Sequence, residues 1–221
     1  MDLQPLLAFI PLAFTALFPV VNPIGTAILF QNLTENAPGK TRRFIARKIA
    51  ANSLVLMLLT LVIGVYILKV FGISIPVVQV CGGMVLFYMG WKSLNSDEDN
   101  NEASRKEFVR EDMGSALGNK AFYPFTFPLT VGPGTIATTL TLSAEAAKDK
   151  NELWAEAYIG AGIAMLLIAL IIALTYGYSD RLVERLSPNL RKVIMRLLNF
   201  ILLCIGGQIT INGIRSVLMT F

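Results

Sequence analysis

A motif rich in proline and glycine occurs twice inside apolar segments of this sequence. The first copy runs from Phe18 to Thr26 and the second from Phe127 to Thr135, and each contains Phe-Pro, a five-residue spacer with another proline, and Gly-Thr. Each copy lies in an uncharged stretch longer than the roughly 20 apolar residues that cross a bilayer. Helix-breaking residues at corresponding places in two halves of a membrane protein indicate a transporter's substrate site.

The composition agrees with a membrane protein. Only 15% of the 221 residues are charged and 54% are hydrophobic, whereas a soluble domain carries roughly 25% charged residues. The first Lys or Arg is Lys40, so the first apolar segment lacks the basic start of a signal peptide. The net charge of +4 reflects basic residues that flank apolar segments, and we expect no nucleic-acid binding. Cys81 and Cys204 lie within apolar segments and are expected to be small packing residues, with neither a disulfide nor a metal site.

The apolar runs predict an all-α membrane protein with six transmembrane helices. Their approximate ranges are 4–33, 46–70, 74–94, 120–145, 154–178 and 194–219. The charged stretch 96–119 is expected to be a cytoplasmic linker between a first three-span half, 1–95, and a second, 120–221, within one integral-membrane domain.

The Lys and Arg residues predict the orientation, because short cytoplasmic loops carry an excess of them. With six spans, 15 of the 19 Lys and Arg residues fall on one side, and only Lys69, Lys148, Lys150 and Arg215 fall on the other. The three basic loops should therefore face the cytoplasm, and both termini should lie outside.

The end of the first half also recurs at the end of the second. The pattern Cys-x-Gly, six residues, Gly-x-Lys/Arg-Ser begins at Cys81 and again at Cys204. Because each half has an odd number of spans, the second half must enter the membrane from the opposite side. The sequence therefore predicts two inverted three-helix repeats, with spans one and four broken near the midplane.

Each break should expose backbone groups that can bind a solute. A half-helix that begins near Thr26 or Thr135 presents unpaired N–H groups and a positive dipole end, which favour a carboxylate, and the two threonine hydroxyls can donate to the same group. Carbonyls around Val20–Asn22 and Leu129–Val131, together with the Asn22 side chain, can accept from an ammonium group or hold Na⁺. The predicted site residues are Asn22, Pro23, Gly25, Thr26, Thr130, Gly132, Pro133, Gly134 and Thr135.

Two alternatives stay open for these polar and helix-breaking residues. The breaks can be packing kinks, since proline and glycine are common in transmembrane helices. Three polar residues inside spans, Gln79, Gln208 and Asn212, are secondary site candidates, and interhelical hydrogen bonding is their alternative role. The glycine-rich faces of spans three and six can pack closely, and a homo-oligomer through those faces is not excluded.

Missing residue types narrow the chemistry further. No charged residue lies in the middle of a predicted span, and the chain has no His. A proton relay, an acid–base enzyme and a metal centre each need such groups. The expected cargo is therefore a net-neutral small solute, moved passively or together with an ion such as Na⁺ that backbone oxygens hold, and no other cofactor is expected.

Four segments resemble the MarC family of bacterial and archaeal membrane proteins, also described as a neutral amino acid transporter family. They are Asn22-Pro23 with Gly25, Phe71–Pro76, Gly132–Ile136 and Gln208–Ile214. The resemblance runs over nearly the whole chain. It implies an inner-membrane protein of two inverted halves that transports small neutral amino acids such as glycine and alanine. A carrier or exporter for another neutral solute, a channel, and a non-transport membrane scaffold are the alternatives.

Overall fold

The computed structural model describes residues 3–34, 37–95, 121–146, 154–185 and 187–219, and all regular structure in these ranges is helical. The elements in chain order are α1 (Leu3–Val21), α2 (Pro23–Leu33), α3 (Gly39–Val70), α4 (Ile75–Asn95), η2 (Phe122–Thr130), α6 (Pro133–Ala146), α7 (Trp154–Gly177), α8 (Ser179–Arg185) and α9 (Pro188–Leu218). The expected linker, 96–119, lies outside the described residues.

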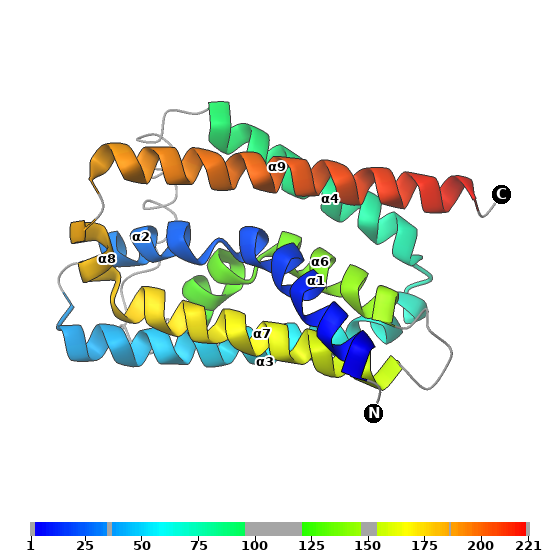
Figure 1. Ribbon diagram of the computed structural model, residues 1–221, viewed down its shortest axis with the longest axis horizontal. Coiled ribbons are helices and arrows are strands. Elements are labelled where there is room, and N and C mark those ends of the chain that lie inside the picture. The colour runs from blue at the N-terminus through cyan, green and yellow to red at the C-terminus, as the bar shows by residue number, and fades with distance from the viewer. Residues whose placement is uncertain (1–2, 35–36, 96–120, 147–153, 186, 220–221) are drawn as a thin grey trace.

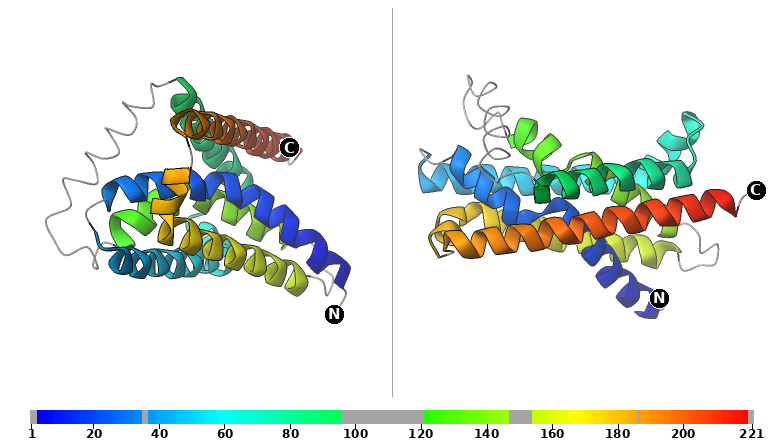
Figure 2. Two further views of the ribbon diagram at one scale, coloured as in Figure 1. Left: turned by 60° about the vertical axis from the view of Figure 1, so that its left-hand side comes forward. Right: turned by 90° about the horizontal axis from the view of Figure 1, so that it is seen from above.

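The helices form three layers that run along the long axis of the molecule (Figure 1). One layer is the pair α4 and α9, and the opposite layer is the pair α3 and α7. The broken segments α1–α2 and η2–α6 lie between them, where α1 and α2 pack on α7 while η2 and α6 pack on α3. Two further views show the same layering (Figure 2). The segments that carry the repeated motif are thus the middle layer.

Within the described ranges, five helical segments are long and apolar enough to cross a membrane. They are Leu6–Leu33, Gly39–Val70, Ile75–Asn95, Ala155–Gly177 and Lys192–Leu218. The predicted fourth span, 120–145, is instead two short pieces, η2 of 9 residues and α6 of 14 residues. Neither piece reaches the length of a bilayer on its own, because the predicted break divides them.

One predicted span boundary is wrong, because α3 and its candidate span begin at Gly39 and not at 46. The candidate span of α9, Lys192–Leu218, agrees with the predicted 194–219, although the helix itself begins at Pro188. Both helices continue through basic residues beyond the apolar stretch. Helix α8, of 7 residues in the fifth connection, was not predicted from the sequence.

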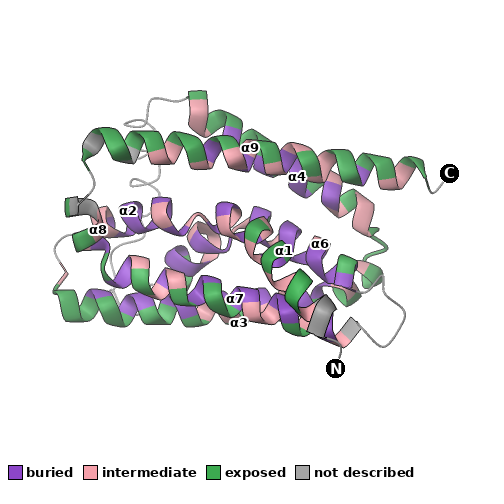
Figure 3. Ribbon diagram, viewed as in Figure 1, coloured by how far each residue is buried: buried purple, intermediate pink, exposed green. Residues whose placement is uncertain are grey.

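Buried and exposed positions separate by side of each helix (Figure 3). Most of α2 and α6 is buried, whereas large apolar side chains are exposed on the outward sides of α3, α4 and α9. An exposed apolar surface of this kind is suited to lipid. Both termini lie at one end of the molecule, and the starts of α3 and α9 lie at the other (Figure 1).

Glycines bring α4 and α9 into close contact. A Cβ placed on Gly90 would lie 2.7 Å from the Leu203 nitrogen, and a Cβ on Gly213 would lie 2.8 Å from the Val80 nitrogen. The two Cys-x-Gly motifs are 123 residues apart. At the same spacing Gly90 corresponds to Gly213 and Val80 corresponds to Leu203, so the two contacts are equivalent in the repeat.

A second pair of contacts is related by the same spacing of 123 residues. Gly83 lies against Thr210, and Gly206 lies against Phe87. The glycine-rich faces of α4 and α9 therefore pack against each other within one chain.

Candidate functional site

The first break is a single residue. Helix α1 continues through Pro19 to Val21, and only Asn22 leaves the helical path, with φ 48° and ψ 59°. Asparagine tolerates this left-handed conformation because its short polar side chain bonds locally. Here Asn22 caps α2, since its Oδ1 accepts from the Gly25 N–H at 3.1 Å, and Pro23 occupies the first helical position.

The open carbonyls at this break agree in part with the expected Val20–Asn22 set. The Phe18 carbonyl accepts from the Asn22 N–H at 3.0 Å, and the Asn22 carbonyl accepts from the Thr26 N–H at 3.0 Å. Pro23 has no N–H to give to Pro19, and the Gly25 N–H that would reach Val21 is bound to the Asn22 side chain. The Ile24 N–H makes no bond to the Val20 carbonyl either, so the carbonyls left open by the break are those of Pro19, Val20 and Val21.

The second break follows the π-helix η2. Tyr123 and Phe127, which precede prolines, have extended backbones with φ −114° and −118°, as the residue before a proline prefers. The hydrogen bonds of η2 reach five residues back, and the last joins the Val131 N–H to the Thr126 carbonyl at 2.8 Å. Helix α6 then starts at Pro133.

The first turn of α6 leaves more backbone N–H groups without an acceptor than the first turn of α2. Its first intrahelical bond runs from the Ile136 N–H to the Gly132 carbonyl at 3.1 Å, so the N–H groups of Gly134 and Thr135 precede that bond. Gly132 has no side chain that could cap them, in contrast to Asn22 at the start of α2. The N-terminus of α6 is thus the better anion site of the two.

The two repeat-equivalent threonines differ in their bonds. Thr26 is the fourth residue of α2, and its hydroxyl donates to the Asn22 carbonyl at 2.8 Å. Thr135 is the third residue of α6, so the carbonyl four residues earlier belongs to Val131, outside the helix. Thr135 is 2% exposed, and its hydroxyl does not make the bond to the N-cap carbonyl that the Thr26 hydroxyl makes.

The two breaks contact one another. A Cβ placed on Gly134 would lie 3.5 Å from Cγ1 of Val20 and against the Leu86 side chain. The start of α6 therefore lies beside the end of α1 and beside α4. Asn22 and Gly132 are half-buried and Pro133 is exposed, whereas Pro23, Gly25 and Gly134 are buried.

Two further hydroxyls on α6 were missed from the sequence. Thr138 and Thr139 follow Thr135 at spacings of three and four residues, which places all three on one face of the helix. They are 2% and 0% exposed, and in the described part of the chain neither hydroxyl has a partner. In contrast, the Thr141 hydroxyl on the same helix donates to the Ala137 carbonyl at 3.0 Å.

The neighbours of α6 show where this hydroxyl face points. Ala137 packs on α4 at Gly82, while Leu140 packs on α3 at Gly64. The remaining helices in contact with α6 include α1 and α7, so the three hydroxyls lie on the side of those helices. The spacing of the three threonines was the sequence signal for this face.

Thr130 has a structural role. It is 1% exposed, and its hydroxyl bonds to the Phe125 carbonyl at 2.7 Å and to the Tyr176 hydroxyl at 3.0 Å. The ring of Phe30 stacks on Tyr176 at 5.1 Å and meets Phe125 edge-on at 5.3 Å. Thr130 therefore helps to join η2 to α2 and α7.

The three secondary candidates lie on α4 and α9. Gln79 is 8% exposed on α4, beside Gly213 of α9. Gln208 and Asn212 are exposed on α9, and the Gln208 Nε2 donates to the Asn212 Oδ1 at 2.9 Å. The structure does not bring Gln208 or Asn212 to the breaks.

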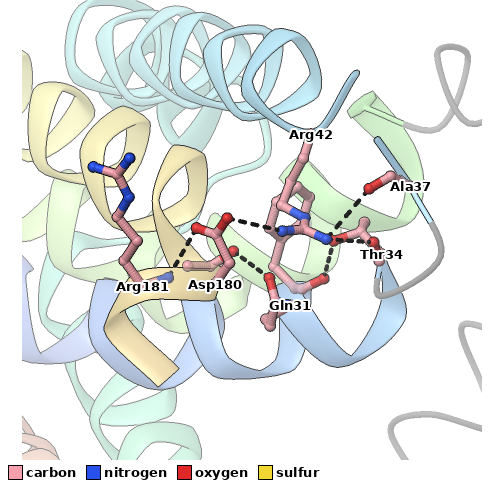
Figure 4. Close-up of polar contacts among 8 residues, drawn as sticks. Gln31, Thr34, Ala37, Arg42, Asp180 and Arg181 are labelled. Carbon is pink, nitrogen blue, oxygen red and sulfur yellow. Dashed lines mark hydrogen bonds and ion pairs between the residues drawn. The ribbon is translucent and has the colours of Figure 1, made fainter. Parts of the chain in front are cut away.

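A buried arginine joins three elements at the end opposite the termini (Figure 4). Arg42, in the first turn of α3, is 6% exposed and donates to the carbonyls of Thr34 at 3.0 Å and Ala37 at 3.3 Å. It also pairs with Asp180 of α8 at 3.6 Å. Beside it, the Ser179 hydroxyl donates to the Gln31 side chain at 2.8 Å. This network fixes the C-terminal end of α2, the half-helix that follows the first break.

The part of the chain that the structure describes contains no group of three His, Cys, Asp or Glu side chains able to hold a metal. The oxygen atoms near the breaks are backbone carbonyls, hydroxyls and the Asn22 amide. These are ligands for a hard monovalent ion such as Na⁺ or for a small polar solute.

Comparison with known proteins gives a family match along almost the whole chain. Residues 7–218 match the family described as "MarC family integral membrane protein". The "UPF0056 inner membrane protein MarC" of Escherichia coli O157:H7 is 29% identical over 214 residues, with 96% of each chain covered. The "UPF0056 membrane protein MJ1677" of Methanocaldococcus jannaschii is 31% identical over 221 residues, with 99% of this chain and 100% of the relative covered. No solved structure matches.

Proposed function

The chain belongs to the MarC family of integral membrane proteins, and we propose that it is a secondary transporter of small neutral amino acids of the glycine and alanine type. The observation that carries this proposal is the start of α6. Two open N–H groups, a buried Thr135 hydroxyl and the unpartnered hydroxyls of Thr138 and Thr139 gather on one half-helix. Buried polar groups without partners are costly, and a polar solute would satisfy them.

The amino acid would lie between the two breaks. Its carboxylate would accept from the N–H groups of Gly134 and Thr135 and from the Thr135 hydroxyl, at the positive end of α6. Its ammonium group would donate to the open carbonyls of Pro19, Val20 and Val21, and Na⁺ is the other ligand suited to these oxygens. The contact between Gly134 and Val20 supports this placement, because it brings donors and acceptors from the two halves together.

We further propose that the chain crosses the membrane six times, as two inverted repeats with both termini outside. Counting η2 and α6 as one broken span supports the number six. The repeat-equivalent glycine contacts of α4 and α9 support inversion, as does the packing of α1 and α2 on α7 and of η2 and α6 on α3. Transport would proceed by alternating access, as the halves rock around the breaks.

The deciding experiment is counterflow in proteoliposomes with labelled glycine and alanine, with and without a Na⁺ gradient. Saturable exchange that unlabelled neutral amino acids inhibit is expected, and a Na⁺ effect would establish coupling. A channel cannot drive labelled solute against its gradient, and a membrane scaffold would not exchange solute. Absence of counterflow from folded protein would overturn the assignment.

A pair of variants on α6 tests the site itself. Thr135→Val should raise the concentration for half-maximal exchange about tenfold, since one hydrogen bond to a charged group is lost. Thr141→Val removes a hydroxyl that is already bonded within the helix, and it should leave exchange unchanged. Equal transport by the two variants would count against the proposed site.

A further inference from the structure

Two amide side chains lie on the outer face of α9, away from the breaks. Gln208 and Asn212 are exposed, although no charged residue lies between Arg196 and Arg215. At 1.5 Å per residue, Arg196 and Arg215 are about 28 Å apart, close to the thickness of the hydrocarbon core. Gln208 is then about 10 Å inside Arg215 along the helix axis, at a depth where lipid supplies no hydrogen bonds.

The bond between the two amides leaves most of their capacity unused. Each carboxamide has two N–H donors and an oxygen with two lone pairs. The 2.9 Å bond from Gln208 to Asn212 uses one donor and one lone pair. The Gln208 oxygen and both Asn212 N–H groups take no part in that bond, so a partner that supplies both a donor and an acceptor fits this surface.

The residues around Gln208 form a seam with the spacing of a coiled coil. Alternate steps of four and three residues, the spacing that keeps one face toward a partner helix, connect Leu197, Ile201, Cys204, Gln208, Ile211 and Arg215. Leu197 and Ile211 are 57% and 61% exposed, and Cys204 is exposed. The opposite face of α9 carries the glycines that pack on α4. The seam is thus a second, unpartnered interface on this helix.

We propose that α9 pairs with α9 of a second copy of this chain, in parallel, along this seam. Copies inserted in the same orientation carry Gln208 at the same depth, so an amide of one copy meets an amide of the other. A carboxamide both donates and accepts, and the surface is therefore complementary to itself about a two-fold axis, as an isologous dimer requires. One polar position within an apolar seam also fixes the register of the two helices. This dimer does not depend on the identity of the transported solute.

The two natural cysteines supply the test. Cys204 lies on the seam one turn from Gln208, whereas Cys81, its repeat equivalent, lies on α4. In native membranes treated with copper phenanthroline, the Cys81→Ser variant should form a disulfide-linked homodimer through Cys204. The matched Cys204→Ser variant should stay monomeric on the gel.

A third variant tests the role of the amide. Gln208→Leu in the Cys81→Ser background should lower the initial rate of crosslinking about three- to tenfold, the range for one or two interhelical hydrogen bonds in a membrane. Gln208 is exposed, so the substitution leaves the packing of the chain intact. Equal crosslinking by Cys204→Ser and Cys81→Ser, an unchanged rate in Gln208→Leu, or capture of a different protein by Cys204 would each overturn the proposal.

Discussion

Replacing Thr139 by valine should stabilise the protein while it impairs transport. The hydroxyl of Thr139 is fully buried and unpartnered among the described residues. A buried polar group without a hydrogen bond costs about 1–3 kcal/mol, and valine keeps the β-branched shape and so the rotamer preference in a helix. The free energy of unfolding should therefore rise by about 1–2 kcal/mol, which corresponds to an increase in Tm of about 2–8 °C for a chain of this size.

The matched control is Thr141→Val on the same helix. The Thr141 hydroxyl donates to the Ala137 carbonyl at 3.0 Å, so its loss should lower the free energy of unfolding by about 0.5–1.5 kcal/mol. Thermal unfolding of detergent-solubilised protein gives both Tm values, and counterflow gives the transport rate. The substitution at 139 should reduce solute affinity about three- to tenfold, whereas the substitution at 141 should not. A Tm that falls in both variants would refute the reasoning, because Thr139 would then have a partner within the folded chain.

Two further predictions concern the α4–α9 contact and the Arg42 network. Gly206→Ala should lower the free energy of unfolding by about 1–3 kcal/mol, because the added Cβ would lie 2.8 Å from the Gly83 carbonyl oxygen. The control is Gly207→Ala, whose Cβ would lie 3.7 Å from its nearest neighbour and which should leave the stability unchanged. Equal Tm values for the two variants would contradict the close approach of α4 and α9. Arg42→Met should cost about 2–3 kcal/mol, since two carbonyls lose a charged donor. Asp180→Asn should cost less than about 1 kcal/mol because the pair is solvent-exposed on one side. A larger loss of stability in Asp180→Asn than in Arg42→Met would show that the ion pair, and not the two carbonyl bonds, is the main contribution of Arg42.

The sequence predicted the membrane helices well where hydrophobicity decides them. Apolar runs locate α4 and α7 to within one residue at each end. They do not locate the first residues of helices α3 and α9, because a helix continues into water when its next residues favour helix and carry charge. Ser187 caps α9 through its bond to the Leu190 N–H at 3.3 Å. The extra turn of α9 therefore begins at a side-chain cap, which a hydropathy pattern does not register, whereas α3 begins after Pro38 without a side-chain cap.

The roles of the polar residues could not be predicted from the sequence for a different reason. Thr130 lies in the repeated motif and Gln208 in a family-like segment, yet the first is bonded to Tyr176, 46 residues away, and the second is exposed. Their roles depend on which helix lies opposite, a tertiary property that the residue type does not carry. The buried face of Thr138 and Thr139 was visible as a spacing, but threonine usually bonds to its own helix. Only the absence of that bond distinguishes them.

The two breaks are related by sequence but differ in chemistry, and one proline position explains the difference. Proline takes the first helical position at both breaks, and it stands three residues before Thr26 but two before Thr135. The second helix therefore starts one residue later in the repeat, so the N-cap carbonyl stands four residues before Thr26 but three before Thr135. At the same time Val131 replaces Asn22, so no side chain caps the second helix. An exchange of the two halves' conformations during transport would leave these residues in place. The carboxylate would then stay at α6 in every state, and the solute would keep one orientation while the halves move around it.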